Sequence, residues 1–580
     1  MKRKIISFLI GVFVATSSIV AQETEVLPIG LTNQEKSLIV DFSFNATRVS
    51  PPPSEEVRTS AQWEEVEYLV IRWTNQFSNI QRQIVEAAIQ ECQVLIVTQN
   101  PAAVESYLQS NGIDLTKVEF INAASNSIWI RDYAGNTVYT DDVGERALVE
   151  WIYNRPRPDD DDIPIYQASY IGVPLYATVS APADLVNTGG NFMSDGIGTA
   201  FASHLVTMEN AAGNPYGVSP KTEADIDQIM AEYMGIDRYI KMDVLPYDGI
   251  HHIDMHMKLL DEETLLVSKY PEGVADGPFI QENIDYVLSN FLTPFGNPYT
   301  VHWIDAPPSP SGNYPDTGGA YRTYTNAVIV NKTILVPTYR PEVDIPALQQ
   351  LEALMPGYTV VGIDVDNTAE NLISLGGAIH CITHTIGVAD PLLIVHEKIV
   401  ETNTTVDIPV DAWIKHISGI QQAKVYWRVS GDENFEEIAM SHVQDDQWST
   451  LLTVPTDAQK IEYYIWAQAN SGKSLSRPLV APEGYWTFTI GTLGISEWAS
   501  QNITGPYPNP TYDQVSFSLK QIPGPIDIAI YNILGQELYS QQLLHGNGNV
   551  TLSLNPEWSG TLLVVFRGEF GTVHKKVLKL

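Results

Sequence analysis

Three polar clusters, far apart in the chain, hold the side chains best suited to chemistry. The first ends in Asp132, the second contains His252 and Asp254, and the third carries Cys381 shortly after two glycines. Cysteine is the strongest nucleophile among protein side chains, and a nearby cation or histidine lowers the pKa of its thiol. A histidine close to it can act as general acid and then as general base.

The two carboxylates, Asp132 and Asp254, restrict what the cysteine could attack. Negative charge beside a thiolate raises the pKa of the thiol, which would hinder a protease. The same charge is useful if the substrate is a cation. A guanidinium is planar with five donors, and carboxylates bind it through charge-assisted, often bidentate hydrogen bonds. Two aspartates, one histidine and one cysteine therefore predict attack on a guanidinium carbon.

Each of these residues also has a simpler interpretation. A single cysteine is usually a small buried hydrophobe, which is our interpretation of Cys92, where a helix is expected to run into a buried strand. Cys381 differs because it follows Gly376-Gly377 and has histidines before and after it. Asp132 could form a surface ion pair with Arg131. Five histidines and two aspartates across the clusters could hold zinc, although no HExxH or comparable zinc spacing is present.

A recurring unit between about residues 60 and 390 must position these clusters. Each unit has an amphipathic helix, a short apolar strand, a loop rich in Gly, Asn and Asp, and a two-stranded hairpin. Helices are expected at 102–110, 223–234, 282–291 and 343–354, and hairpins at 128–139, 255–269 and 326–337. Equivalent points of the units are Asp132, Gly190, Asp254, Asn326 and Cys381.

Five such units at a roughly regular spacing predict an α/β fold of the repeat class, a five-bladed α/β propeller. No single unit could bury its own apolar face, so the units must pack on one another. Equivalent loops of a propeller converge on its axis, so the three polar clusters would meet in space. The alternative is a doubly wound α/β sheet, against which each unit ends in a hairpin rather than in a single parallel strand.

Two all-β sandwich domains are expected after the propeller, which we place at 22–394. From 395 to 492 the helix signals vanish and alternating strands separated by turn residues appear, as in an immunoglobulin-like sandwich without a disulfide. A third unit at 493–580 opens near Pro508-Asn509-Pro510 and has the alternation of a small β-sandwich.

The ends and the composition of the chain exclude several functions. Residues 1–21 combine a basic start, an apolar run and small residues up to Ala21, which predicts a secretory signal peptide. A net charge of −36 argues against nucleic acid as a partner and is compatible with a cationic substrate. Two cysteines exclude a disulfide scaffold and a four-cysteine zinc site. No other stretch is apolar over about 18 residues, so we expect no membrane span in the mature chain.

The set of motifs resembles the agmatine deiminase and Porphyromonas-type peptidylarginine deiminase family, part of the guanidino-modifying superfamily. The matching segments are, in order, Trp129-Ile130-Arg131-Asp132, Gly189-Gly190-Asn191-Phe192-Met193, His252-Ile253-Asp254, Thr325-Asn326-Ala327 and Gly376-Gly377-Ala378-Ile379-His380-Cys381. The family's fold is a five-bladed α/β propeller, in agreement with the repeat.

The resemblance also implies a role for each site residue. Cys381 would be the nucleophile, His252 the general acid and base, Asp132 and Asp254 the guanidinium ligands, and Asn326 a polar contact of the active site. The reaction would release ammonia through a covalent thiouronium intermediate, which water hydrolyses to citrulline. The resemblance implies no metal and no organic cofactor.

Arg155 and Arg157 separate the two branches of this family. The segment 153–159 resembles the Arg-Pro-Arg element of the bacterial peptidylarginine deiminases, where two arginines bind the substrate's α-carboxylate. Prolines stiffen such a loop, two guanidinium groups can clamp one carboxylate, and agmatine has none. The implied substrate is therefore arginine in peptides or proteins, preferably at the C-terminus, with Trp129 as a further substrate contact.

Three alternatives stay open for these residues and for the chain. Both arginines could pair with the acidic run 159–162. The substrate could be agmatine or free arginine. The protein could also be a non-catalytic, secreted surface-binding protein on a deiminase scaffold.

The last segment resembles the C-terminal sorting domain of the type IX secretion system. The Pro-Asn-Pro opening, the Tyr-Asn-Ile-Leu-Gly-Gln strand at 531–536 and the basic terminal strand all match. The resemblance implies export through the periplasm and across the outer membrane, a secreted or cell-surface location, and the type IX secretion machinery as a partner.

Overall fold

The computed structural model of the chain describes residues 26–39, 50–402, 404–490, 502–522, 524–532, 537–544, 546–568 and 571–579. The chain divides into two compact units, Met1–Pro391 and Leu392–Leu580. This division lies close to the boundary expected near residue 395, while the domain limits themselves stay predictions. The expected signal peptide at 1–21 lies outside the described residues. None of the helices in the described ranges is long and apolar enough to cross a membrane.

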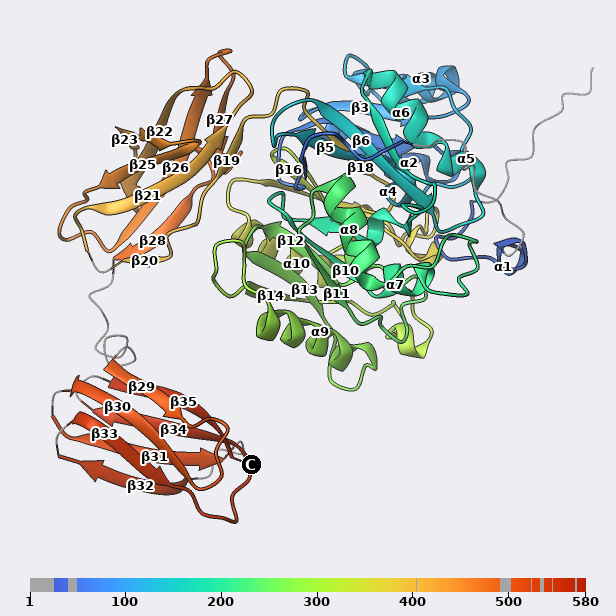
Figure 1. The fold of residues 1–580 in the computed structure, drawn as a ribbon. Coiled ribbons are helices and arrows are strands. Elements are labelled where there is room, and N and C mark those ends of the chain that lie inside the picture. Colours follow the sequence, from blue (N-terminus) through green and yellow to red (C-terminus); the bar gives the residue numbers. More distant parts are fainter. Residues whose placement is uncertain are drawn as a thin grey trace, which may run out of the picture. The chain divides into compact units, whose positions relative to one another are not determined.

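Five small sheets make up the strand structure described in the first unit (Figure 1). Each has an antiparallel pair of strands and a further strand parallel to one of that pair. The sheets are β5 (Asn136–Thr140), β6 (Arg146–Tyr153) and β7 (Leu175–Thr178), with β1 (Val57–Thr59) and β8 (Val186–Asn187) added; β9 (Met193–Ser194), β10 (Thr199–Ser203) and β11 (Arg238–Met242); β12 (Met257–Asp261), β13 (Thr264–Lys269) and β14 (Thr300–Asp305); β15 (Val328–Val330), β16 (Thr333–Thr338) and β17 (Thr359–Asp364); and β18 (His384–Gly387), β2 (Val66–Arg72), β3 (Gln93–Val97) and β4 (Val118–Ile121).

The parallel strands are reached through helices, as crossovers between parallel strands require. These helices are α2 (Ser78–Ala88), α3 (Pro101–Ser110), α6 (Ile163–Ile171), α8 (Glu223–Met234), α9 (Asp276–Asn290) and α10 (Pro341–Leu354). The helix α8 shows how the sequence sets its limits. Thr222 caps its first turn by accepting from the backbone N–H of Asp225, and Gly235 ends it in the left-handed conformation with a φ of 64°. Only α9 departs clearly from the predicted limits, because it begins six residues earlier, at Asp276 instead of 282.

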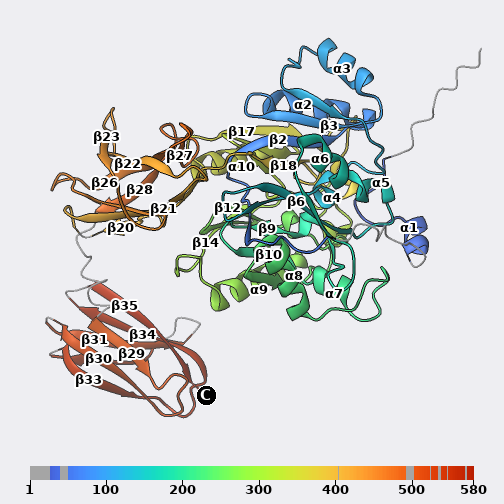
Figure 2. The ribbon, with the colours of Figure 1, turned by 45° about the horizontal axis from the view of Figure 1, so that its top comes forward.

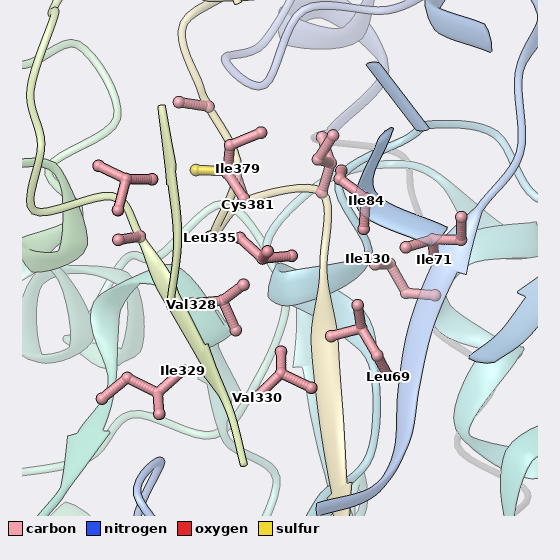
Figure 3. Packing of buried hydrophobic residues seen from close by; sticks show 14 of the residues in the cluster. Leu69, Ile71, Ile84, Ile130, Val328, Ile329, Val330, Leu335, Ile379 and Cys381 are labelled. Atoms are coloured by element: carbon pink, nitrogen blue, oxygen red, sulfur yellow. The ribbon is translucent and has the colours of Figure 1, made fainter. Parts of the chain in front are cut away.

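The end of the first unit joins the sheet of its beginning. The strand β18 pairs antiparallel with β2, with His384 opposite Val70 (Figure 2). A large cluster of buried apolar side chains packs beside this sheet and includes Leu69, Val328 and Cys381 (Figure 3). A single doubly wound sheet is not what forms here, since the strands fall into separate short sheets. The placing of the five sheets round one axis, as blades of a propeller, stays a prediction.

The hairpin predicted at 128–139 is wrong in its position. Residues Ile130–Tyr133 form the short helix α4, and the hairpin lies further along the chain, between β5 and β6. All four residues of α4 are buried. A half-buried strand would expose every second residue. Arg131 and Asp132 are instead both buried, so this segment lacks the alternation of such a strand.

The second unit contains two sets of strands, each with its own apolar core, in the ranges that the structure describes. The first set is β19 (Leu393–Val395), β20 (Glu401–Thr402), β21 (Ile408–Lys415), β22 (Ile420–Val429), β23 (Glu436–Ala439), β24 (Ser441–Gln444), β25 (Gln447–Leu452), β26 (Lys460–Ala469), β27 (Ser474–Arg477) and β28 (Trp486–Ile490). The second set is β29 (Ile503–Tyr507), β30 (Gln514–Ile522), β31 (Ile526–Asn532), β32 (Glu537–Leu543), β33 (Gly546–Ser553), β34 (Gly560–Gly568) and β35 (Gly571–Lys579). The C-terminal region is thus built of β-strands, as predicted. Of the segment 531–536, Tyr531 and Asn532 end β31, and 533–536 lie outside the described residues.

Candidate active site

The equivalent points of the five predicted units occupy equivalent places in the five sheets. Each lies within four residues of the first strand that follows it. Asp132 is in α4 ahead of β5, Gly190 is in the short turn η3 (Gly189–Asn191) ahead of β9, Asp254 is in the turn η4 (Ile253–Met255) ahead of β12, Asn326 precedes β15, and Cys381 precedes β18. The repeat in the sequence thus places each of these residues just before a strand of a different sheet. The contacts described below show which of their side chains lie close together.

Cys381 is fully buried and has an amide and a carboxylate at its sulfur. Asn326 Nδ2 lies 3.2 Å from Cys381 Sγ, and Asp254 Oδ2 lies 3.6 Å from it. A Cβ atom at Gly377 would lie 3.0 Å from Sγ, so any residue larger than glycine would crowd the sulfur. The pKa of the thiol is raised well above its ordinary value, first by burial and then by the charges of Asp254 and Asp132. The buried guanidinium of Arg131 also interacts with Cys381, but the net effect still holds the nucleophile as a thiol.

Asn326 holds the loop of the nucleophile as well as its sulfur. Its Oδ1 accepts the backbone N–H of His380 at 3.0 Å and that of Cys381 at 3.4 Å. The backbone carbonyl of Asn326 also accepts from the N–H of His380, at 3.0 Å. The predicted polar contact of Asn326 is thus one that fixes where Cys381 lies.

The carboxylates of Asp132 and Asp254 are both buried, and each is held through one oxygen. Asp132 Oδ1 accepts the N–H of Gly190 at 3.1 Å, and Asp254 Oδ2 lies 2.7 Å from His380 Nδ1. The other two oxygens, Asp132 Oδ2 and Asp254 Oδ1, have no hydrogen-bond partner among the described residues. A buried acceptor left unpaired costs about 1–3 kcal/mol, and more when it is charged. The two oxygens are therefore available to donors that a ligand would bring.

Both aspartates are hard to ionise where they lie. Burial raises the pKa of Asp132 to about 6, although the charge of Arg155 opposes this effect. The pKa of Asp254 is raised well above its ordinary value, by burial and then by the charge of Asp132. A cation bound between the two carboxylates would favour the charged form of both.

His252 is fully buried beside Asp132, with 3.6 Å between His252 Nδ1 and Asp132 Oδ1. Neither ring nitrogen has a hydrogen-bond partner within the part of the chain that the structure describes. Burial, followed by the charge of Arg155, lowers the pKa of His252 well below its ordinary value, so the ring is neutral. Gly190 makes room for the ring, since a Cβ there would lie 2.4 Å from His252 Nδ1. A neutral imidazole in this place can accept a proton.

His380 is a site residue for which we predicted no role. Its Nδ1 lies 2.7 Å from Asp254 Oδ2, and its Nε2 lies 2.5 Å from Gln62 Nε2. Lys258 Nζ donates to Gln62 Oε1 at 2.6 Å. The signal in the sequence was the position of His380 next to the nucleophile. Gln62 is 318 residues away along the chain, so no local pattern marks it.

Arg155 and Arg157 are buried, and a segment from the beginning of the chain occupies their donors. Arg157 Nε donates to Glu35 Oε1 at 2.7 Å, and an Nη2 hydrogen of Arg157 reaches Pro28 O at 2.7 Å. Arg155 Nε donates to Ile29 O at 2.9 Å. Arg157 thus pairs with the carboxylate of Glu35. The acidic run 159–162 was the alternative partner, and Glu35 lies outside it.

Trp129 lies between this segment and the loop of the nucleophile. Its Nε1 donates to Leu27 O at 2.9 Å, and its Cζ3 would lie 2.6 Å from a Cβ at Gly377. The indole is fully buried. Trp129 is therefore next to the nucleophile loop, as the prediction of a substrate contact requires. Its indole N–H is donated to the backbone carbonyl of Leu27.

The histidines of the site suggested a metal centre as an alternative. In the described ranges, no group of three or more His, Cys, Asp and Glu side chains is placed to hold a metal ion. That the reaction needs no metal stays a prediction.

Comparison with known proteins identifies the first unit. Residues 56–386, more than half of the chain, match the sequence model of the Porphyromonas-type peptidyl-arginine deiminase family. The chain belongs to this family. Its chemistry is the deimination of guanidino groups by hydrolysis of a C–N bond. The motifs that carried the predicted resemblance, from Trp129 to Cys381, all lie within the match.

Individual relatives are more distant. A protein of Shewanella baltica (strain OS223) assigned as an agmatine deiminase is 26% identical over 300 residues, covering 46% of this chain and 76% of that protein. One from Streptococcus mutans with the same assignment is 27% identical over 295 residues, covering 46% and 75%. A solved structure assigned as an agmatine deiminase has a TM-score of 0.50 at 20% identity, covering 58% of this chain and 96% of its own. The agmatine deiminase of Enterococcus faecalis has a TM-score of 0.49 at 19% identity, covering 59% and 98%. The first of these structures supports the α/β fold of the first unit and nothing beyond it.

The end of the chain matches a second family. Residues 506–579 match the sequence model of the secretion system C-terminal sorting domain. The predicted sorting domain is thereby confirmed, and it indicates export across the outer membrane to the cell surface or beyond.

Proposed function

We propose that this chain hydrolyses the guanidinium of arginine to the ureido group of citrulline, preferably when arginine ends a peptide. One observation carries the proposal. Two unpaired carboxylate oxygens, Asp132 Oδ2 and Asp254 Oδ1, belong to the buried site that contains Cys381 and His252. A guanidinium brings N–H donors to both oxygens and a positive charge that favours the ionised form of both carboxylates, neither of which a neutral substrate supplies.

The substrate also supplies what the nucleophile lacks. A positive charge between the carboxylates offsets their effect on the pKa of the Cys381 thiol. The thiol gives its proton to neutral His252 while Sγ bonds to the guanidinium carbon. His252 then returns the proton to a terminal nitrogen, the C–N bond breaks, and ammonia leaves a thiouronium on Cys381.

The second half of the reaction restores the enzyme. A water molecule gives a proton to His252 and adds to the thiouronium carbon. The C–S bond then breaks, Cys381 leaves with the electron pair and regains a proton, and citrulline is formed. Over the whole cycle a guanidinium and one water give citrulline, ammonia and one proton, which His252 takes from the water and then releases to solvent.

Arg155 and Arg157 support a substrate that carries a carboxylate. Arg157 already binds a carboxylate in this structure, with Nε at 2.7 Å from Glu35 Oε1 and Nη2 at 3.3 Å from Glu35 Oε2. Agmatine has no carboxylate that these arginines could bind. We place the α-carboxylate of a C-terminal arginine at this pair and assign Trp129 as a neighbouring substrate contact. The runner-up is agmatine or free arginine, and the relatives assigned as agmatine deiminases favour agmatine.

A comparison of four substrates tests the proposal. The full chain is incubated, with a chelator present, with a peptide ending in arginine, the same peptide as its C-terminal amide, agmatine, and free arginine. Formation of the ureido product is followed against Cys381→Ala. We expect the fastest turnover with the free-carboxylate peptide and none with the variant. Turnover of agmatine alone would contradict the peptidyl assignment, and binding without turnover of any substrate would favour a non-catalytic surface protein.

For the whole chain we propose the following organisation. The five sheets are the blades of a propeller at 22–394, an immunoglobulin-like sandwich occupies 395–492, and the sorting domain occupies 493–580. The repeated strand order of the five sheets and the pairing of β18 with β2 support the first of these assignments.

A further inference from the structure

The segment 26–39 is packed on the loops that form the candidate active site. Ile29 N donates to Leu375 O at 3.0 Å, just before the glycines that precede the nucleophile. Ile29 is 1% exposed, and a Cβ at Gly376 would lie 2.8 Å from its Cγ2. The neighbouring Leu27 accepts the N–H of Trp129. The segment therefore contacts the nucleophile loop and a predicted substrate contact at once.

Glu35 gives this segment the chemistry of a substrate. Its carboxylate meets Arg157 with both oxygens, at 2.7 Å and 3.3 Å. The short helix α1 (Asn33–Leu38) fixes it there, because Glu35 Oε2 also accepts the N–H of Thr32 at 2.8 Å in a capping box. Burial by itself would raise the pKa of Glu35, but the hydrogen bond from Arg157 and the one from Thr32 lower it below the ordinary value. The residue is therefore a carboxylate in the place where a substrate carboxylate is expected.

The reactive groups themselves are closed off from solvent. Cys381 and His252 have no exposed surface, and Asp132 and Asp254 are each 1% exposed. A peptide can reach them only if something moves, and the segment 26–39 holds the arginines that the peptide would need. We propose that residues 26–39 are a built-in inhibitor in which Glu35 stands in for the substrate's carboxylate at Arg157.

This inference rests on the proposed function, and it has a kinetic consequence. An inhibitor that belongs to the same chain competes with every substrate at a fixed effective concentration. It raises KM for all substrates by the same factor and leaves kcat unchanged once the segment has left. Weakening its hold should therefore lower KM whether or not the substrate carries a carboxylate.

Glu35→Gln in the full chain tests the inference, because it removes the charge and keeps the shape. Lys36→Gln is the matched control, since Lys36 is exposed in the same helix. The first readout is the rate at which iodoacetamide modifies Cys381, followed by mass spectrometry. Cys92 serves as the internal standard, because it lies in the apolar core and burial raises the pKa of its thiol to about 12.

We expect Glu35→Gln to raise the rate of Cys381 modification at least about tenfold, as loss of a buried charged hydrogen bond implies. The control and Cys92 should not change. KM for the arginine-terminated peptide should fall by a similar factor at constant kcat. Modification does not require turnover, so a protein that proves not to be a deiminase would still reveal whether the segment covers the site.

A second variant guards against an effect of Glu35→Gln on folding alone. Ile29→Ala removes the buried apolar anchor of the segment and leaves Glu35 in place, and thermal melting monitors the fold of each variant. If modification and KM match the wild type in both folded variants, residues 26–39 do not inhibit the enzyme.

Other contacts carry a second inference, about His380. Lys258 Nζ donates to Gln62 Oε1 at 2.6 Å, which leaves the amide nitrogen of Gln62 facing His380 Nε2 at 2.5 Å. An amide nitrogen only donates, so Nε2 is the acceptor and the proton of the neutral ring is on Nδ1. That proton is donated to Asp254 Oδ2 at 2.7 Å. We infer that His380 is a positioning residue that holds one oxygen of Asp254 and leaves the other for the substrate.

Two replacements of His380 separate positioning from mere packing. The amide nitrogen of asparagine can take the place of Nδ1, whereas that of glutamine extends toward the place of Nε2. We expect His380→Asn to keep most of kcat/KM and His380→Gln to lose roughly tenfold or more. Loss of the donor also raises the pKa of Asp254, so the acidic limb of the pH profile should move upward in His380→Gln only. Equal losses and unmoved limbs in both folded variants would overturn this role.

Discussion

Cys381 Sγ lies 3.6 Å from Asp254 Oδ2, so the nucleophile and a carboxylate share one buried space. Burial and the charges of Asp254 and Asp132 all raise the pKa of the thiol. Replacing Asp254 by asparagine should therefore make the Cys381 thiol more reactive and at the same time slow the turnover of substrate. The pKa of the Cys381 thiol should fall, and its modification by iodoacetamide at a fixed pH should become faster. Turnover of arginine substrates should fall by about a hundredfold or more, because the guanidinium loses a charged ligand.

Both effects of Asp254→Asn can be measured on one sample. The modification rate is recorded against pH without substrate, and the ureido product is recorded with substrate. Faster modification together with undiminished turnover would show that Asp254 tunes the thiol without binding the guanidinium.

The two cysteines should differ sharply in what they contribute. Cys381→Ala should abolish turnover, because no other group can form the thiouronium. Cys92→Ala should keep turnover, because Cys92 lies in the apolar core and burial raises the pKa of its thiol to about 12. The substrate should still bind to Cys381→Ala, which calorimetry with an arginine-terminated peptide can detect. Product formed by that variant would contradict the covalent mechanism.

Asp132 should make activity and stability respond to acid in opposite ways. Burial raises its pKa to about 6 in the folded chain, against an ordinary value of 3.8. Below pH 6 the protonated residue no longer attracts a cation, so kcat/KM should fall about tenfold per pH unit. A raised pKa means that the folded state binds the proton more tightly than the unfolded state. This residue therefore adds stability as the pH falls from about 6 toward 4, and that stability is lost as the pH rises again.

Kinetics and thermal melting across this range separate the two effects. Asp132→Asn should remove the contribution of this residue to the pH dependence of stability. A kcat/KM that stays constant down to pH 5 would show that Asp132 is already ionised in the free enzyme.

Gly190 leaves the space that His252 fills, so Gly190→Ala should be severe. A Cβ there would lie 2.4 Å from His252 Nδ1 and 3.0 Å from Asp132 Oδ1, and both neighbours are buried. We expect turnover to fall by about a hundredfold or more, since the acid–base group and a guanidinium ligand are displaced together. Gly277→Ala is the matched control, because its nearest neighbour would be 3.6 Å away and helix α9 favours alanine. Similar kinetics in the two variants would contradict the tight packing at His252.

The repeat made most of the site predictable. Asp132, Asp254, Asn326 and Cys381 each lie shortly before a strand of a different sheet, so finding equivalent points in the sequence was enough to group them. The strands themselves could be located because parallel strands such as β3 are buried along most of their length and therefore form short apolar runs.

What the sequence did not reveal depends on contacts between distant segments. The hairpin near Asp132 was misplaced because α4 is buried on all sides and shows no period. The partner of Arg157 could not be predicted either. Glu35 is 122 residues away, and the nearby acidic run looked more plausible. The position of His380 beside the nucleophile was visible, but nothing in the sequence pointed to its link with Gln62.

The pairing of β18 with β2 makes the position of the nucleophile depend on a contact between the two ends of the first unit. Cys381 lies three residues before the start of β18, the strand that completes a sheet begun more than 300 residues earlier. A chain in which this pairing has not formed therefore lacks the contact that holds the strand next to its nucleophile. Activity then depends on completing the fold of the first unit, and we expect a copy without this pairing to show no turnover.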